Sequence, residues 1–564
     1  MKRNLSLLLA LTMLLGLLAG CSMKPPEPME DDASHNDKND AAPEDQKSPQ
    51  PASGEKDAEQ YLNVLLSDEP SVLDVARFLG VTDRNLFMNL KEPLVRIENG
   101  EIVGSGAESW DISDDGLTYT FHLRENYWSD GQKVTAQDYI TALQRQCDPA
   151  NAFAFTADYA DIKNFTAISK GEADPSTLGA TAPDDSTLVL ELEQINVALL
   201  ASTDFFPDRA DIAQQHGDTL GAEADKTPCC GPFSLKSWNH NSSLELTKNE
   251  KYWNAEKVYL QNVTYHIIPD QNAQLASLEN GSLDYLGVST PEYVTKFQGR
   301  DDMSEMMFST GRTVMVLFNC EDPILSNPKI RMALSLSMDR DALVEVVTNG
   351  VSTPAYSLVP PDSYVGSLNF RENAEEPLEA VMAANPDPKA LLIEGMKEAG
   401  LGEDPSKLTL TLSWGATTAT ARTYAELYQQ IWQDELGCVI ELEFNDNATH
   451  MGNVNNANYQ LATFSWGADY EPQFQLSRWA NKVGGHSRWK NEEYVSLVNQ
   501  ASQTQDEKER LELYAKAEKM LVEDAAMAPL YFGATRRFYY NYVHGLTGNA
   551  FDKTGFINVY TSGR

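Results

Sequence analysis

The chain has 564 residues, 42% of them hydrophobic and 23% charged, so it is long enough for about two to four domains, each with its own core. Its formal net charge of -39 argues against binding to nucleic acid or to an anionic membrane surface. Solubility explains such an acidic surface well, so the charge alone identifies no site.

The N-terminus has the pattern of a secretory signal. Lys2 and Arg3 precede an apolar stretch, residues 5–19, that is too short to span a membrane. The stretch ends in Leu-Leu-Ala-Gly-Cys, which resembles the lipobox of bacterial lipoproteins. The resemblance implies a signal peptide over residues 1–20 and lipidation of Cys21. The alternative is an ordinary signal with an incidental cysteine.

Residues 21–57 are predicted to be a disordered acidic tether. Between residues 22 and 60 the chain has six prolines, eleven acidic and four basic side chains, and almost no large apolar group. Such a segment cannot offset its ordering entropy. As a coil it would reach roughly 35 Å, so the folded body is expected to stand just outside the cell membrane, on its extracellular face.

The remaining cysteines form no metal or disulfide pattern. Five cannot all pair internally, and the adjacent Cys229 and Cys230 have no second pair nearby, so no metal site is predicted. Buried thiols and a single bridge both remain open. The five are Cys147, Cys229, Cys230, Cys320 and Cys438.

Strands and helices alternate from residue 61 onward. Residues 117–123 alternate apolar and polar side chains and predict a strand, and Asp138 is placed to help cap a helix that begins at Thr135. Asn327-Pro328 predicts the start of one helix that Asn349-Gly350 ends. Similarly, Asp387-Pro388 begins a helix that Gly400 ends.

A βαβ unit follows in the second half of the chain. Strands 408–414 and 438–444 flank a helix over 420–436, so the two strands are expected to be parallel. The tetrapeptide SWGA occurs at 413–416 and again at 465–468, each time after an alternating run. In open α/β sheets ligands gather beyond the carboxyl ends of strands, so both SWGA stretches are predicted to line a cleft.

No enzyme signature is present in the sequence. The eight histidines are scattered without HExxH, and GxSxG, P-loop and paired CxxC motifs are absent. We therefore predict a protein that is not an enzyme and needs no metal and no cofactor. A surface hydrolase with a carboxylate pair stays open, because acidic pairs are too common here to exclude one.

Several segments closely resemble the oligopeptide-binding lipoproteins of peptide ABC importers, the family 5 extracellular solute-binding proteins. They occur in the family's order over nearly everything from residue 61 to the C-terminus. They are SDDGLTYTFHLRENYWSDGQKVTAQDY, CGPFSLKSW, LTKNEKYWNAEKVYLQNVTYHII, NPKIRMALSLSMDRDAL, PAYSLVPP, GADYEP and LYAKAEKMLVEDAAMAPLYF.

The resemblance implies a two-lobed α/β fold of the periplasmic-binding-protein type, with a hinge and an extra small domain. Lobe I would comprise residues 58–100, 226–311 and 535–564. The small domain would cover 101–225 and lobe II 312–534. Binding energy would drive closure of the lobes over a ligand.

By the same resemblance, Asp469 is expected to pair with the α-ammonium of a peptide, which is costly to bury alone. The backbone of Ser465 and Gly467 would pair with the peptide as an added strand. Trp466 and Trp414 would supply apolar walls. Without the family, an Asp in this position is more often a turn or helix-cap residue.

Two pairs of residues are weaker candidates. Gly80 and Val81 loosely match a second strand of the family that pairs with the peptide. Tyr159 and Tyr531 are aromatic residues that would face the cleft unless they belong to the core. The sequence departs from the family in two places. The loop after Asp469 is one residue shorter, and Thr463 stands where the family has a basic residue that can meet the carboxylate of a short peptide.

The predicted function is a lipid-anchored, monomeric receptor that captures oligopeptides and delivers them to the permease subunits of an ABC importer. The same scaffold binding another solute, such as an oligosaccharide, a metal chelate or a signalling peptide, is the alternative. The sequence leaves open the length and side-chain preference of the peptide.

Overall fold

The computed structural model describes residues 55–78, 80–202, 204–480 and 485–564. The predicted signal peptide, Cys21 and nearly all of the predicted tether lie outside these ranges. Within the described residues, no helix is both long and apolar enough to cross a membrane.

The central feature is a mixed sheet in the order β11-β19-β12-β18-β16-β17, to which the short β13 adds beside β19. Strand β12 is antiparallel to both β18 and β19, whereas β16 is parallel to β17 and β18. The strands are β11 (Tyr285–Val288), β12 (Met303–Phe318), β13 (Thr353–Pro354), β16 (Thr409–Trp414), β17 (Val439–Phe444), β18 (Leu461–Gly467) and β19 (Met527–Tyr540).

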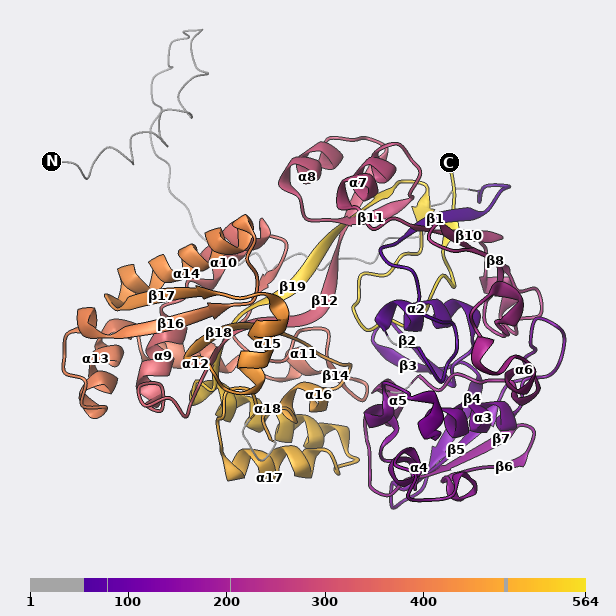
Figure 1. Ribbon diagram of the computed structural model, residues 1–564, viewed down its shortest axis with the longest axis horizontal. Helices are drawn as coiled ribbons and strands as arrows, with labels where there is room; N and C mark the ends of the chain where they lie inside the picture. Colours follow the sequence, from indigo (N-terminus) through magenta and orange to yellow (C-terminus); the bar gives the residue numbers. More distant parts are fainter. Residues whose placement is uncertain (1–54, 79, 203, 481–484) are drawn as a thin grey trace, which may run out of the picture. The chain divides into compact units, whose positions relative to one another are not determined.

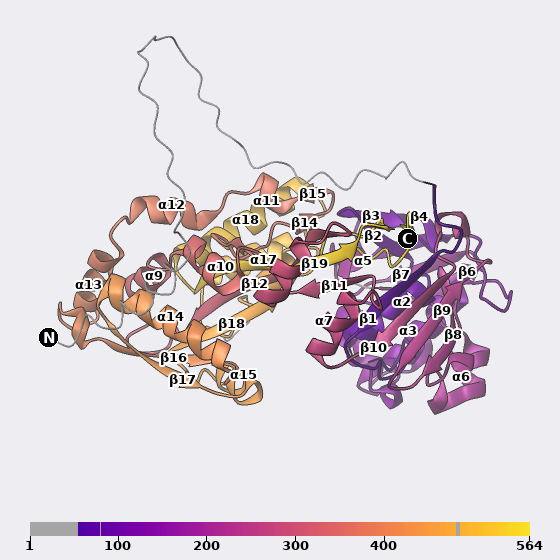
Figure 2. The same cartoon turned by 90° about the horizontal axis from the view of Figure 1, so that it is seen from above.

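Further sheets are built mainly from the first half of the chain. Strands β1, β10, β9 and β8 lie side by side in that order (Figure 2). Their bounds are β1 (Tyr61–Leu66), β8 (Phe233–Asn239), β9 (Ser243–Lys248) and β10 (Asn262–Ile267). A second sheet, in the order β4-β5-β7-β6, comprises β4 (Ala107–Ile112), β5 (Thr118–Leu123), β6 (Ala180–Asp184) and β7 (Thr187–Glu191). Short pairs are β2 (Val95–Glu98) with β3 (Glu101–Gly104), β14 (Tyr364–Val365) with β15 (Leu368–Asn369), and β20 (Val543–His544) with β21 (Tyr560–Thr561).

The helices connect and cover these sheets (Figure 1). In the first half they are α2 (Val81–Leu90), α3 (Ala136–Cys147), α4 (Phe165–Ser169), α5 (Leu199–Ser202), α6 (Ala210–His216), α7 (Gln271–Glu279) and α8 (Pro291–Gln298). In the second half they are α9 (Pro328–Leu336), α10 (Arg340–Thr348), α11 (Phe370–Asn373), α12 (Pro377–Ala384), α13 (Pro388–Glu398), α14 (Ala419–Leu436), α15 (Asn447–Asn455), α16 (Gln473–Leu476), α17 (Glu492–Ala501) and α18 (Glu507–Glu523).

The predicted βαβ unit is confirmed. Strands β16 and β17 pair in parallel from Thr409 opposite Val439 to Trp414 opposite Phe444, and α14 connects them. Gly437 ends α14 with a φ of 79°, a left-handed conformation that glycine adopts without steric cost. The cap of α3 is confirmed as well, because the Asp138 carboxylate accepts a hydrogen bond from the Thr135 amide at 2.8 Å.

One predicted helix is two. The segment that begins at Asn327-Pro328 stops at Leu336, and a new helix starts at Arg340. The reason is local: Asp339 has an extended backbone and its carboxylate accepts a hydrogen bond from the Ala342 amide at 3.0 Å, which makes it the N-cap of α10. The predicted ends at Asn327 and Asn349 are confirmed.

Strands β12 and β19 are the longest strands described, and their pairing is irregular in the middle. Ser309 pairs with Ala534 and Arg312 with Gly533, so two residues of β12 are inserted at this point. Gly311, one of the two, has a φ of 60°. The lobe boundaries predicted at 311/312 and 534/535 fall at this bulge, and the division into lobes itself stays a prediction.

Two large hydrophobic cores accompany these sheets. One is formed by β1 to β10 with α2 and α3, and the other by the central sheet with α9, α13, α14 and α18. The five described cysteines are all free thiols, and all but Cys320 are buried. The structure therefore agrees with the alternative of unpaired thiols and not with that of a single disulfide bridge.

Candidate functional site

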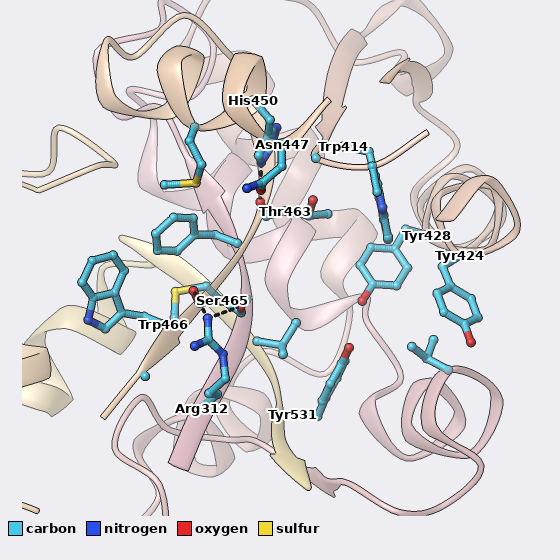
Figure 3. Close-up of a pocket in the computed structure, with 18 of the residues that line it drawn as sticks. Arg312, Trp414, Tyr424, Tyr428, Asn447, His450, Thr463, Ser465, Trp466 and Tyr531 are labelled. Carbon is cyan, nitrogen blue, oxygen red and sulfur yellow. Dashed lines mark hydrogen bonds between the residues drawn. The ribbon is translucent and has the colours of Figure 1, made fainter. Parts of the chain in front are cut away.

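A pocket of about 860 Å³ opens at the carboxyl ends of β16 and β18. Both SWGA stretches line it, as the strand order predicted: Trp414 to Ala416 contribute from the first and Ser465 to Ala468 from the second. The other lining residues are Arg312, Val314, Met315, Val347, Thr348, Tyr424, Tyr428, Asn447, His450, Met451, Thr463, Phe464, Phe474 and Tyr531 (Figure 3).

The pocket exists because β16 and β18 separate. Their pairing ends at Ser413 opposite Ala462, and His450 of α15 stands between the strands beyond that point. Its Nε2 donates to the Thr463 carbonyl at 2.9 Å, and its Nδ1 lies 3.1 Å from the Ser413 hydroxyl. A Cβ atom at position 415 would lie 2.7 Å from the His450 ring, so glycine at this position leaves room for the ring between the strands.

Beyond this point one edge of β18 is open. The Ala468 amide donates to Gly311 of the neighbouring strand β12, and Gly467 lies opposite Arg312. Hydrogen bonding alternates along an antiparallel ladder, so the amides and carbonyls of Ser465 and Gly467 point away from β12. They face the side that β16 no longer covers, where they can pair with an extended chain once the Ser465 carbonyl, which accepts a hydrogen bond from the Arg312 side chain, is released.

Asp469 follows directly after this edge and is half-buried. Its carboxylate accepts a hydrogen bond from the Tyr470 amide at 2.8 Å, and within the described part of the chain it forms no ion pair. The buried Tyr470 fixes the segment: its hydroxyl lies 2.7 Å from the Gly100 carbonyl and 2.6 Å from the Gly366 carbonyl. Asp469 is thus a carboxylate held in place by its own segment, without an ion pair among the described residues, although the Arg84 guanidinium on α2 lies within its electrostatic reach.

Aromatic rings form one wall of the pocket. Trp414 packs edge-on against Tyr428 with ring centroids 5.3 Å apart, and Tyr424 and Tyr531 lie beside them (Figure 3). Trp466 points to the other side of β18, where it stacks on Phe464 at 5.5 Å. The rings offer apolar surface for variable groups of a ligand.

The predicted site residues are therefore only partly brought together. Trp414, Ser465, Trp466, Gly467 and Tyr531 line the pocket, and Asp469 adjoins it through Ala468. Whether they contact a ligand stays a prediction.

Tyr159 does not face this pocket. It is 4% exposed in the first core, stacks on Phe165 at 5.5 Å and donates its hydroxyl to the Asp204 carbonyl at 3.2 Å. The expectation that it faces the cleft is corrected accordingly: packing among neighbouring aromatic rings and a backbone acceptor hold the side chain inside its own core.

Gly80 and Val81 do not form a strand. Gly80 has extended backbone and caps α2, and Val81 is the first residue of that helix. The helix nevertheless lies within electrostatic reach of Asp469. Burial would lower the pKa of Arg84 on α2, but the neighbouring carboxylate of Asp204 and, more weakly, that of Asp469 raise it. A loose sequence match could not distinguish extended backbone before a helix from a strand.

Sequence reasoning missed several pocket residues. Tyr424 and Tyr428 are spaced four residues apart on α14, and this spacing, just after a strand end, was a usable signal. No comparable signal marked His450, Asn447 or Arg312. In addition, the described residues contain no cluster of three or more His, Cys, Asp or Glu side chains placed to hold a metal ion.

A mixed α/β fold with an aromatic pocket beyond strand ends is an architecture for binding a solute. Residues 101–487 match the family model of the bacterial extracellular solute-binding proteins, family 5. The chain belongs to this family, and it is a binding protein rather than an enzyme.

Individual relatives agree on the class and differ in their solutes. The chain is 29% identical to the oligopeptide-binding protein OppA of Bacillus subtilis, over 85% of this chain and 89% of the relative. It is 30% identical, with the same coverage, to the probable deoxycholate-binding periplasmic protein YgiS of Escherichia coli. The solved structure of the murein tripeptide binding protein MppA, in its unliganded open form, superimposes with a TM-score of 0.76 at 26% identity, covering 91% of this chain and 99% of that one. The fold is therefore that of the periplasmic binding proteins.

Proposed function

We propose that this protein captures extracellular oligopeptides and delivers them to the permease of an ABC importer. The observation that carries the proposal is the open edge of β18, whose outward amides and carbonyls at Ser465 and Gly467 lead directly to the carboxylate of Asp469. A peptide that adds as a strand would gain main-chain hydrogen bonds irrespective of its side chains. Its α-ammonium would be neutralised by Asp469.

The test is to identify what the protein carries. Freshly purified protein is denatured, and the released material is analysed by mass spectrometry. We expect peptides with free amino termini, and we expect synthetic peptides of this kind, added to ligand-free protein, to raise its melting temperature. Release of sugars or sterols, with no stabilisation by any peptide, would refute the proposal.

A second candidate ligand is an amphipathic organic acid. Its support is the aromatic wall of Trp414, Tyr424, Tyr428 and Tyr531, together with the similarity to a probable deoxycholate-binding protein. Such a ligand has no ammonium and would not need Asp469. Tight binding of bile acids that survives replacement of Asp469 would favour this candidate over peptides.

We further propose that Cys21 carries a lipid anchor that holds the protein at the extracellular face of the cell membrane. The motif before Cys21 and the proline-rich acidic segment after it support this location. Replacing Cys21 with serine is expected to move the protein from the membrane fraction to the medium, because a lipid anchor is then no longer attached. Cell fractionation and intact-mass measurement check this. An unmodified wild-type protein in the medium would contradict it.

A further inference from the structure

Arg312 occupies an unusual place beside the open edge of β18. It belongs to β12 and lies directly opposite Gly467. Its Nη2 donates to the Ser465 carbonyl at 3.1 Å and to the Ser465 hydroxyl at 2.9 Å (Figure 3). A Cβ added at Gly467 would lie 3.8 Å from its Nη1. The side chain therefore passes over Gly467 and brings its guanidinium to the edge where a peptide would lie.

This guanidinium has only neutral acceptors. Within the described residues it forms no ion pair, although the protein as a whole has 83 acidic residues against 44 basic ones. No acidic side chain lines the pocket, and Arg312 is the one arginine or lysine among the described residues that does. A planar guanidinium matches a carboxylate with two parallel hydrogen bonds, so an exposed one without an acidic partner is prepared for an anion.

Two tyrosine hydroxyls add to this arrangement. Tyr428 is 2% exposed and Tyr531 is half-buried, and neither hydroxyl has a hydrogen-bond partner among the described residues. In Figure 3 the two hydroxyls point toward one another within the pocket. Burial raises the pKa of Tyr428 well above its usual value, so its hydroxyl stays protonated and can donate. Both hydroxyls can therefore donate to a ligand oxygen that enters this part of the pocket.

We propose that Arg312, assisted by the hydroxyls of Tyr428 and Tyr531, binds a carboxylate of the ligand and selects short peptides. This inference rests on the proposed function, because it places the peptide's amino group at Asp469. Ser465 precedes Asp469 by four positions, and an extended chain advances about 3.3 Å per residue. The carboxylate of a peptide of about three residues would then arrive at Arg312.

A carboxylate at this place has two sources. It is the C-terminus of a tripeptide, or the side chain of an acidic residue at the third position of a longer peptide. In either case the guanidinium would exchange its bonds to Ser465 for charge-assisted bonds to the ligand, which leaves the Ser465 carbonyl free for a peptide amide.

The experiment measures the dissociation constants of two ligand pairs by calorimetry. The first pair is trialanine as the free acid and as the C-terminal amide. The second is a pentapeptide amide with glutamate or glutamine at position three. We expect the member that carries the carboxylate to bind at least about tenfold more tightly in one pair or in both. A preference in the first pair identifies the peptide C-terminus as the source of the carboxylate, and a preference in the second pair identifies the acidic side chain. In Arg312→Gln the preference should fall to within about twofold, and Arg312→Lys should restore part of it.

Arg312 is exposed, so these variants are expected to fold, and melting temperatures verify this. Tyr428→Phe is a second, independent variant, expected to reduce the same preference without abolishing binding. The inference is overturned if wild-type protein binds acid and amide equally, or if Arg312→Gln weakens both members of a pair alike. Failure of wild-type protein to bind any free-amino peptide would instead refute the proposed function.

Discussion

Replacing Asp469 with alanine is expected to weaken the binding of peptides with a free amino terminus by about 3–5 kcal/mol. Among the described residues the carboxylate accepts a hydrogen bond from the Tyr470 amide and forms no ion pair, so it is available to an incoming ammonium. Once enclosed with the ligand, the ammonium without Asp469 would be a buried unpaired charge. Calorimetric titration with a free and an N-acetylated form of one peptide measures the effect.

The acetylated peptide is the matched control for this substitution. It lacks the ammonium, so it should bind the wild-type protein weakly and should lose little further affinity in Asp469→Ala. The two changes are thus expected to be strongly non-additive. Equal losses for the free and the acetylated peptide would show that Asp469 acts on the shape of the segment and not on the ammonium.

Tyr470→Phe separates position from charge. The hydroxyl of Tyr470 lies within hydrogen-bond distance of the carbonyls of Gly100 and Gly366, and its ring stacks on Tyr364 at 5.3 Å. Asp469 keeps its charge in this variant but loses part of its support. Its binding defect should therefore be smaller than that of Asp469→Ala.

The parts of the fold that were predicted correctly depend on local signals. Gly437 ends α14, Asp387 caps α13, and β16 and β17 follow from alternating side chains on either side of a helix. Each of these depends on residues close together in the chain. The N-cap Asp339 is a local signal as well, but it lies inside a segment whose apolar pattern predicted one continuous helix, so it was not recognised as the start of a second helix.

The candidate site was less predictable because it depends on register and on packing direction. Arg312 reaches Ser465 across 153 positions only because β12 and β18 pair so that Arg312 stands opposite Gly467. A shift of one residue would turn the guanidinium to the other face of the sheet. The prediction for Tyr159 was wrong for a related reason: the sequence shows that the residue is aromatic but not whether its ring faces a ligand or a core.

Arg340→Met is expected to lower the free energy of unfolding by about 3–5 kcal/mol, the largest stability effect that we predict. Arg340 is 2% exposed at the start of α10. Its Nε donates to the carbonyls of Ala355 at 3.0 Å and Pro529 at 2.9 Å, and its other nitrogens donate to Met338 and Ser335. It thereby joins α10 to β19 and to the chain after β13.

Among the described residues Arg340 has no acidic partner, and its charge is met by carbonyl oxygens, by the Ser335 hydroxyl at 3.3 Å and by the Tyr356 ring, whose centroid lies 5.7 Å away. Burial lowers its pKa to about 10, which still leaves the guanidinium charged at neutral pH. Methionine fills similar volume but leaves these buried carbonyls without donors, which costs about 1–3 kcal/mol for each one that water cannot reach. Lys397→Met, which removes an exposed cation 3.2 Å from Glu403, is the control and should change stability by less than about 1 kcal/mol. Urea denaturation of the three proteins measures the difference. If Arg340→Met were as stable as the parent, the cost of burying the guanidinium would equal the value of its hydrogen bonds, and the joint between α10 and β19 would be held by apolar packing alone.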